Sequence, residues 1–191
     1  MSLKHDVVAL VQGPRDLLRE RLTSPPSWPA FVVMIILPLI IIRPIADFLA
    51  SVMTGHPIAA MVLGTSGFVL QVGCLIGLAL ILPTVVRQFH GALTETQSFL
   101  LAAYASIPLW LAGCLYLAPD EFLWLFIISR LAVVAAASYG IYLLHVGLEE
   151  LQVPSRHLVV GATVGGYVTL YLLLWGLLGV TSHIMLIFLR S

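Results

Sequence analysis

Charged residues are scarce in this sequence. Only 9% of the 191 residues are Asp, Glu, Lys or Arg, whereas soluble domains usually carry about 25%. Nine Lys and Arg balance nine Asp and Glu, so no net charge is present that would attract nucleic acid. Because 60% of the residues are hydrophobic and the mean hydropathy is +1.06, we expect the lipid bilayer to surround most of the chain, with no nucleic-acid partner.

Cysteine chemistry and catalytic motifs are sparse as well. The only two cysteines, Cys74 and Cys114, lie in apolar runs on opposite halves of the predicted bilayer, too far apart for a disulfide. The six histidines never repeat at a metal-ligand spacing. We find no Gly-rich phosphate loop, no paired-carboxylate acid-base site in a plausible cleft and no Gly-x-Ser-x-Gly elbow. These absences predict a protein that is not an enzyme and has no metal site, no catalytic residue and no cofactor.

What the sequence does contain is long apolar stretches. About twenty apolar residues are needed for a helix to cross ~30 Å of hydrocarbon. Five stretches approach or exceed that length, at about residues 28–50, 57–84, 98–118, 121–148 and 158–182. We therefore predict an all-α fold, a polytopic membrane helical bundle of five transmembrane helices within residues 28–189, with a kink at Pro38 in the first helix.

Residues 1–27 form a separate cytoplasmic or interfacial segment, predicted as a short amphipathic N-terminal helix. Its apolar face is formed by Leu3, Val7, Leu10 and Val11, and the polar residues Lys4, Asp6 and Gln12 are expected on other faces. Such a helix can lie on the membrane surface. Alternatively, it can be a solvated helix packed on the bundle, and the sequence leaves both arrangements open.

The distribution of Lys and Arg predicts the orientation, because positively charged flanks resist translocation. With five spans, one side receives Lys4, Arg15, Arg19, Arg21, Arg87 and Arg156, and the other receives Arg43 and Arg190. This count predicts a cytoplasmic N-terminus and a C-terminus across the membrane. Glu149 and Glu150 fall in a predicted loop on the cytoplasmic side, where we expect them to be solvated.

Arg130 is the most conspicuous polar residue within a predicted span. It lies about 13 Å below the surface at the start of its helix, where an unpaired charge costs at least ~2.5 kcal/mol. One hypothesis is that Asp47, together with Asp120 or Glu121, neutralises Arg130. The alternative is that Arg130 snorkels or fixes helix packing without a ligand. The candidate intramembrane polar cluster comprises Arg130, Asp47, Arg43 and Gln71.

Small residues mark candidate contacts between helices, because helices in lipid associate through close backbone approach. The candidate positions are the pairs Gly73 and Gly77, Gly161 and Gly165, and Ala132 and Ala136. Two interpretations stay open: packing within one bundle, or contact with a second copy or another membrane protein.

Three stretches of this sequence resemble a known family. GPRDLLRERLTSPPSWPAF (residues 13–31) combines a proline-led amphipathic segment with a tryptophan at membrane entry. QSFLLAAYASIPLWLAGCLYL contains Tyr104 and the in-span Pro108, and SYGIYLLHVGLEELQVPSRH contains Tyr139, Tyr142 and Gly147 before a short loop with Pro154. In this order they resemble bacterial members of the Ypt-interacting protein (Yip) domain family.

The resemblance implies five spans, a cytoplasmic N-terminus and a C-terminus on the other side. Eukaryotic members of that family bind Rab-type GTPases and assist vesicle trafficking. Here the long N-terminal extension and a clear Asp-Leu-Tyr-Gly-Pro signature are missing, which makes a GTPase partner doubtful. The resemblance instead implies a multi-pass protein of the bacterial cytoplasmic (inner) membrane, with a periplasmic C-terminus.

Together these observations predict a non-enzymatic membrane-organising or interaction subunit, whose partners are lipid and either other membrane proteins or a second copy of itself. The alternative function is a small permease or ion-conducting transporter with a polar cluster around Arg130.

Overall fold

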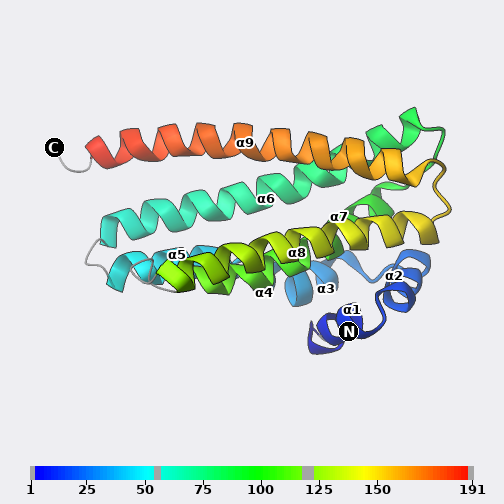
Figure 1. The fold of residues 1–191 in the computed structure, drawn as a ribbon, viewed down its shortest axis with the longest axis horizontal. Helices are drawn as coiled ribbons and strands as arrows, with labels where there is room; N and C mark the ends of the chain where they lie inside the picture. Colours follow the sequence, from blue (N-terminus) through cyan, green and yellow to red (C-terminus); the bar gives the residue numbers. More distant parts are fainter. Residues whose placement is uncertain (1–2, 54–56, 118–122, 189–191) are drawn as a thin grey trace.

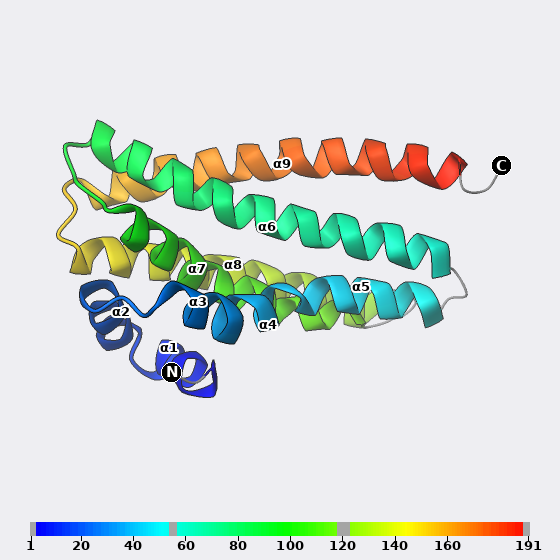
Figure 2. The same cartoon turned by 180° about the vertical axis from the view of Figure 1, so that it is seen from behind.

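The computed structural model of the chain describes residues 3–53, 57–117 and 123–188. Its long helices run side by side along one axis (Figures 1 and 2). Five segments are long and apolar enough to cross a membrane: Trp28–Met53, Ile58–Gln88, Glu95–Leu115, Phe126–Glu150 and Arg156–Ile187. The described residues contain no strand. The predicted all-α polytopic bundle with five spans is confirmed.

The first span is assembled from short helical pieces around Pro38. It consists of α3 (Trp28–Phe31), a π-helical turn (Val32–Ile36), α4 (Leu37–Ile40) and α5 (Ile42–Met53). The Leu37 N–H bonds to the carbonyl of Val32, five residues earlier. Because Pro38 has no N–H and its ring crowds the preceding turn, the wider π turn just before it accommodates the break.

The other four spans are long helices. They are α6 (Pro57–Gln88), α7 (Glu95–Ala112, extended by a 3-10 turn over Gly113–Leu117), α8 (Leu123–Glu150) and α9 (Arg156–Phe188). A capping box starts α7: the Thr94 hydroxyl accepts from the Gln97 N–H at 3.2 Å, and the Gln97 side chain accepts from the Thr94 N–H at 3.1 Å.

The central helix of the bundle is α7, and α9 lies at its periphery. In the most apolar window of the third span 56% of residues are buried, against 6% in the fifth. Leu101, Tyr104 and Ile107 on α7 are completely buried. Gly140 on α8 faces a backbone carbonyl of α7 so closely that a Cβ there would clash with it. The α7–α8 pair is therefore locked by close backbone approach, whereas most of the α9 surface is free of such contacts.

Two short helices, α1 (Leu3–Gln12) and α2 (Pro14–Thr23), pack at one end of the bundle, opposite the end where α9 finishes (Figures 1 and 2). Four leucines of these helices are buried in the same core as the spans: Leu10, Leu17, Leu18 and Leu22. The Tyr139 hydroxyl of α8 donates to the Leu10 carbonyl at 2.7 Å. These contacts attach the N-terminal segment directly to the bundle.

Two sequence-based expectations about this end are wrong. Asp6, expected on a polar face of α1, is completely buried, and Val11, expected on the apolar face, is 71% exposed. Glu149 and Glu150 end α8 instead of lying in a loop, and they pair with Arg15 and Arg19 of α2 at 2.8 and 2.7 Å. The errors at the three carboxylates have one cause: their partners lie far away in the sequence.

Candidate functional site

Arg43 and Asp47 form a loose ion pair on α5. They are four residues apart, which places them on one helical face, and Arg43 Nε lies 3.7 Å from Asp47 Oδ2. The side chains retain 27% and 26% exposure. Gly113 lies directly against the backbone of Arg43, where an added Cβ would be 3.2 Å from its Cα. This close approach fixes the position from which the guanidinium extends.

The pair lines a groove among α5, α6 and α9 with a volume of about 460 Å³. We call it the polar groove and define it by Arg43, Asp47, Ser66, Ser182 and His183. The Ser66 and Ser182 hydroxyls are 2.7 Å apart and connect α6 to α9 across it. A Cβ added to Gly67 would stand 3.5 Å from Asp47 Oδ2, so the glycine leaves room for the carboxylate.

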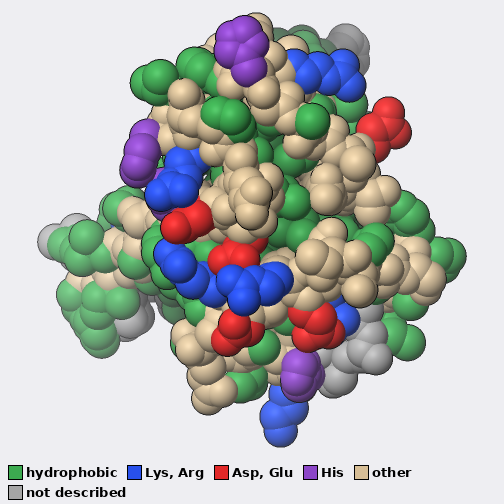
Figure 3. Space-filling view, turned by 90° about the vertical axis from the view of Figure 1, so that its right-hand side faces the viewer, with side chains coloured by type: hydrophobic (Ala, Val, Ile, Leu, Met, Phe, Trp, Pro, Cys, Tyr) green, Lys and Arg blue, Asp and Glu red, His purple; other side chains and the backbone are tan. Residues whose placement is uncertain are grey.

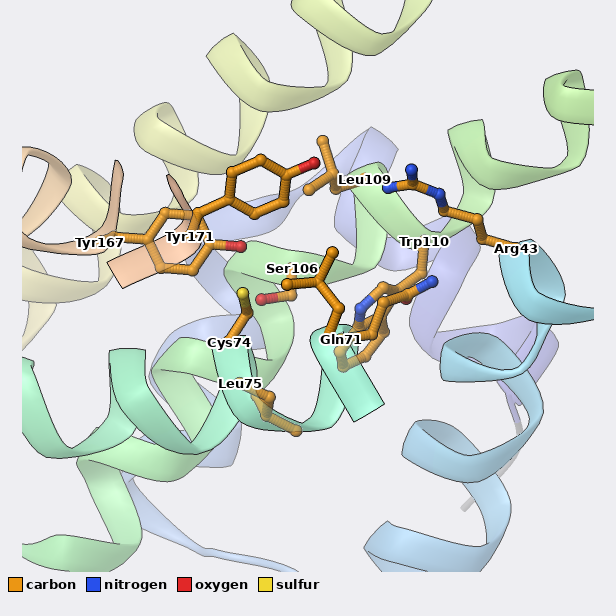
Figure 4. Close-up of a pocket in the computed structure, with 10 residues that line it drawn as sticks. Arg43, Gln71, Cys74, Leu75, Ser106, Leu109, Trp110, Tyr167 and Tyr171 are labelled. Atoms are coloured by element: carbon orange, nitrogen blue, oxygen red, sulfur yellow. The ribbon is translucent and has the colours of Figure 1, made fainter. Parts of the chain in front are cut away.

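A smaller cavity of about 30 Å³ continues from the groove into the bundle, with Arg43 lining both (Figure 4). Gln71 and Cys74 line it from α6, and Tyr167 and Tyr171 from α9. Both polar atoms of the Gln71 amide are buried and have no hydrogen-bond partner within the described residues. A buried amide without a partner costs about 1–3 kcal/mol, and a polar cavity of this size can hold one or two waters.

Polar and apolar groups lie side by side in this part of the bundle. The cavity offers amide, hydroxyl and thiol groups, and an adjoining apolar cavity of about 150 Å³ shares Ser106 and Tyr167 with it. Within the described part of the chain, no group of three or more His, Cys, Asp or Glu residues could hold a metal ion. The site can therefore accommodate a small polar group next to an apolar one.

The structure brings together three of the four residues proposed for the intramembrane cluster. Arg43 and Asp47 line the polar groove, and Arg43 and Gln71 line the smaller cavity next to it. Arg130 is exposed on α8, where its guanidinium carbon lies 4.7 Å from the centre of the Phe126 ring, and among the described residues it lines neither space. Asp120 and Glu121, the other suggested partners of Arg130, lie outside the described residues.

The small-residue pairs fall into different environments. Gly73 and Gly77 on α6 face Leu174 and Leu170 of α9 so closely that a Cβ on Gly77 would overlap the leucine side chain. By contrast, a Cβ on Gly161 or Gly165 would meet no described atom within 4 Å. Ala132 and Ala136 are partly buried on α8.

A second polar cluster holds the N-terminal helices, and we call it the N-terminal lock. Asp6 Oδ2 accepts from the Tyr104 hydroxyl at 2.8 Å, and Oδ1 accepts from Arg21 at 2.9 Å. Burial lowers the pKa of the Arg21 guanidinium, but the hydrogen bond and the charge of Asp6 outweigh it and raise that pKa overall. The lock therefore joins α1, α2 and the central helix α7 through a charged pair.

Surface charges surround this end of the bundle (Figure 3). Positive and negative side chains alternate there, in keeping with the Arg15–Glu149 and Arg19–Glu150 pairs. The hydrogen bond and charge of Glu150 raise the pKa of the Arg19 guanidinium. These pairs attach α2 to the last turn of α8.

Sequence reasoning missed most of the site's uncharged residues. A usable signal was present on α9, where Tyr167, Tyr171 and Trp175 repeat every four residues and so share a face. No comparable signal marks the N-terminal lock, because Asp6 and Tyr104 are 98 residues apart.

The chain was also compared with known proteins. A model of the Yip1 domain matches residues 9–178. No curated protein and no solved structure matches the chain.

Proposed function

Because the chain belongs to the Yip1 domain family and has five helices able to cross a membrane, we propose that it is a non-enzymatic membrane-organising or interaction subunit. In this role it holds partner membrane proteins through the N-terminal helices and through exposed faces of its spans. This role does not require the partner to be a GTPase.

The docking of α1 on the bundle is the observation that carries the proposal. The N-terminal lock and the buried leucines fix α1 in place, yet Val8 and Val11 on its outer face remain 43% and 71% exposed. Lys4 and Gln12 flank these valines in a shallow hollow that includes Val8. A fixed helix that presents apolar and basic groups is suited to binding, since little conformational entropy is lost on association.

A second contact surface is the α9 face around Gly161 and Gly165. No described side chain of the same chain covers these glycines, and small residues allow another helix to approach closely. We propose that this face contacts a membrane partner or a second copy, while Gly73 and Gly77 serve packing within the bundle.

For orientation, we propose a bacterial cytoplasmic membrane with the α1–α2 end in the cytoplasm. Arg15, Arg19 and Arg21 belong to the helix docked at this end, and positively charged flanks favour the cytoplasmic side. The C-terminus is then periplasmic. Labelling of single cysteines with a membrane-impermeant thiol reagent tests this: a cysteine at Thr23 must be protected in intact cells and reactive after lysis.

In-cell photo-crosslinking tests the proposed function. A crosslinker at Val11 should capture a discrete membrane protein, and Asp6→Asn should abolish that product because α1 is no longer held. A crosslinker at Val134 of α8, which is 62% exposed, provides the matched control and should be indifferent to Asp6→Asn. Absence of a protein product at Val11, or a product unchanged by Asp6→Asn, would refute the proposal.

A small permease or ion-conducting protein is the second candidate. The observation in its favour is the cavity lined by Arg43 and by Gln71, whose buried amide has no hydrogen-bond partner among the described residues. Flux of ions or small solutes through protein-containing liposomes, lost in Gln71→Leu, would favour this function over the first. Flux equal to that of empty liposomes would exclude it.

A further inference from the structure

We propose that the polar groove binds the headgroup of a phospholipid that carries both a phosphate and a primary ammonium, as phosphatidylethanolamine does. In this arrangement the ammonium lies on Asp47 and the phosphate on Arg43. The inference does not depend on the proposed function, because it concerns the opposite end of the bundle from α1 and α2.

The charges of the groove match a zwitterion. Arg43 and Asp47 lie 3.7 Å apart, and the side chain of each is about one-quarter exposed, so both can contact a ligand in the groove. A purely anionic headgroup would meet the carboxylate of Asp47, and a quaternary ammonium has no N–H to donate to it. The groove therefore disfavours an anionic headgroup through repulsion and a quaternary ammonium through a missing hydrogen bond, while it attracts a headgroup with a primary ammonium.

Hydroxyl and imidazole groups complete the polar lining. Ser66 and Ser182 lie within the groove from α6 and α9, next to His183. Ser66 also donates to the Val62 carbonyl at 2.7 Å, which fixes its side chain. Because Ser66 gives its one proton to Val62, the Ser182 hydroxyl donates to Ser66, and its oxygen can accept from the headgroup ammonium. An imidazole N–H of His183 can donate to a phosphate oxygen beside Arg43.

The depth of the groove corresponds to a headgroup position. The helices α6 and α9 contain 32 and 33 residues, so each is about 48 Å long at ~1.5 Å per residue. Each helix is therefore longer than the ~30 Å hydrocarbon core and extends beyond it by about 9 Å at either end. Asp47 and Ser182 each lie six residues before the end of their helix, about 9 Å in. The polar groove therefore opens at the boundary between hydrocarbon and headgroups.

The apolar side of the groove favours a lipid over a soluble solute. Leu63, Trp175, Leu178 and Leu186 line it beside the polar groups, and Trp175 is 59% exposed. Tryptophan prefers this depth because its ring is apolar and its N–H is polar. An acyl chain can lie along these residues while the headgroup occupies the charged end.

Native mass spectrometry of the purified full chain in detergent tests the proposal. Phosphatidylethanolamine, phosphatidylcholine and phosphatidylglycerol with identical acyl chains are supplied at equal concentration. We expect roughly tenfold more phosphatidylethanolamine adduct than either other lipid, since one hydrogen bond to a charged group is worth about that factor. Asp47→Asn should reduce the preference to near parity, whereas Asp16→Asn, an exposed carboxylate on α2, should leave it unchanged.

A second variant keeps the test valid if Asp47→Asn disturbs folding. Gly179 lines the groove, and a Cβ there would meet no described atom within 4 Å, so Gly179→Leu should fold normally and fill the groove. We expect it to lose the adduct. Gly176→Leu, on the same helix with equally open space and outside the groove lining, is the matched control and should keep the adduct.

Three results would overturn the proposal. The first is equal binding of the three lipids by the unmodified chain. The second is retention of the preference in both Asp47→Asn and Gly179→Leu. The third is full displacement of the lipid by free phosphoethanolamine at the same concentration, which would assign the groove to a soluble solute.

Discussion

Asp6 and Asp47 lie near opposite ends of the bundle, and the protein treats their carboxylates differently. Asp6 is completely buried and accepts hydrogen bonds from Tyr104 and Arg21. Asp47 is about one-quarter exposed, and its ion pair with Arg43 is 3.7 Å long. Buried charges are stable only when fully paired. The comparison indicates that the N-terminal lock is a buried structural cluster, whereas the charged side chains of the polar groove stay partly exposed.

The largest effect is expected from Asp6→Ala. The substitution leaves Arg21 and the Tyr104 hydroxyl without their acceptor in a buried place, which should lower the free energy of unfolding by about 3 kcal/mol and release α1 and α2. Hydrogen exchange of residues 3–23 should accelerate strongly. Asp16→Ala, on the exposed side of α2, is the control, and equal acceleration in both variants would contradict a locking role for Asp6.

Gly77→Leu should have the next largest effect. The added side chain would overlap Leu170 of α9, and overpacking of this kind typically costs about 1–3 kcal/mol. Thermal unfolding in detergent provides the measurement. Gly176→Leu, where an added Cβ meets no described atom within 4 Å, should change the unfolding temperature little, and a comparable loss in both variants would show that α9 does not pack on α6 as described.

Much of the fold could be predicted from sequence, because lipid makes the length of apolar stretches decisive. The polar sites were harder to predict. Arg43 and Asp47 could be paired because they lie four residues apart on one helix, and Gln71 is brought to them by packing of α6 against α5. The partners of Asp6, Glu149 and Glu150 could not be predicted, since docking of α1 and α2 on distant helices decides them.

Tyr139→Phe should have a smaller effect, confined to the end of the bundle that carries the N-terminal lock. Its hydroxyl donates to the Leu10 carbonyl, and loss of one such bond costs about 1 kcal/mol. We expect a modest increase in hydrogen exchange within α1 and no change in lipid binding at the polar groove. Altered lipid preference in this variant would show that the two ends are coupled.

The smallest effect is expected for the surface pair of Arg15 and Glu149. The two side chains are 56% and 28% exposed, and exposed pairs typically contribute about 0.5 kcal/mol. A double-mutant cycle with Arg15→Gln and Glu149→Gln at low salt should return a coupling of that size, and the coupling should shrink in 0.5 M salt (~4 Å Debye length). A coupling of several kcal/mol that ignores salt would mean that the pair is effectively buried.

The most direct test makes the same chemical change at both ends: Asp6→Asn and Asp47→Asn, each measured by unfolding in the same lipid-free detergent. Each substitution removes one negative charge with almost no change in shape. We predict a loss of about 2 kcal/mol or more for Asp6→Asn, where the mostly buried Arg21 loses its buried partner and keeps the exposed Glu20, and a loss of less than about 1 kcal/mol for Asp47→Asn. Equal losses, or a larger loss at Asp47, would contradict the division between a structural lock and an open groove.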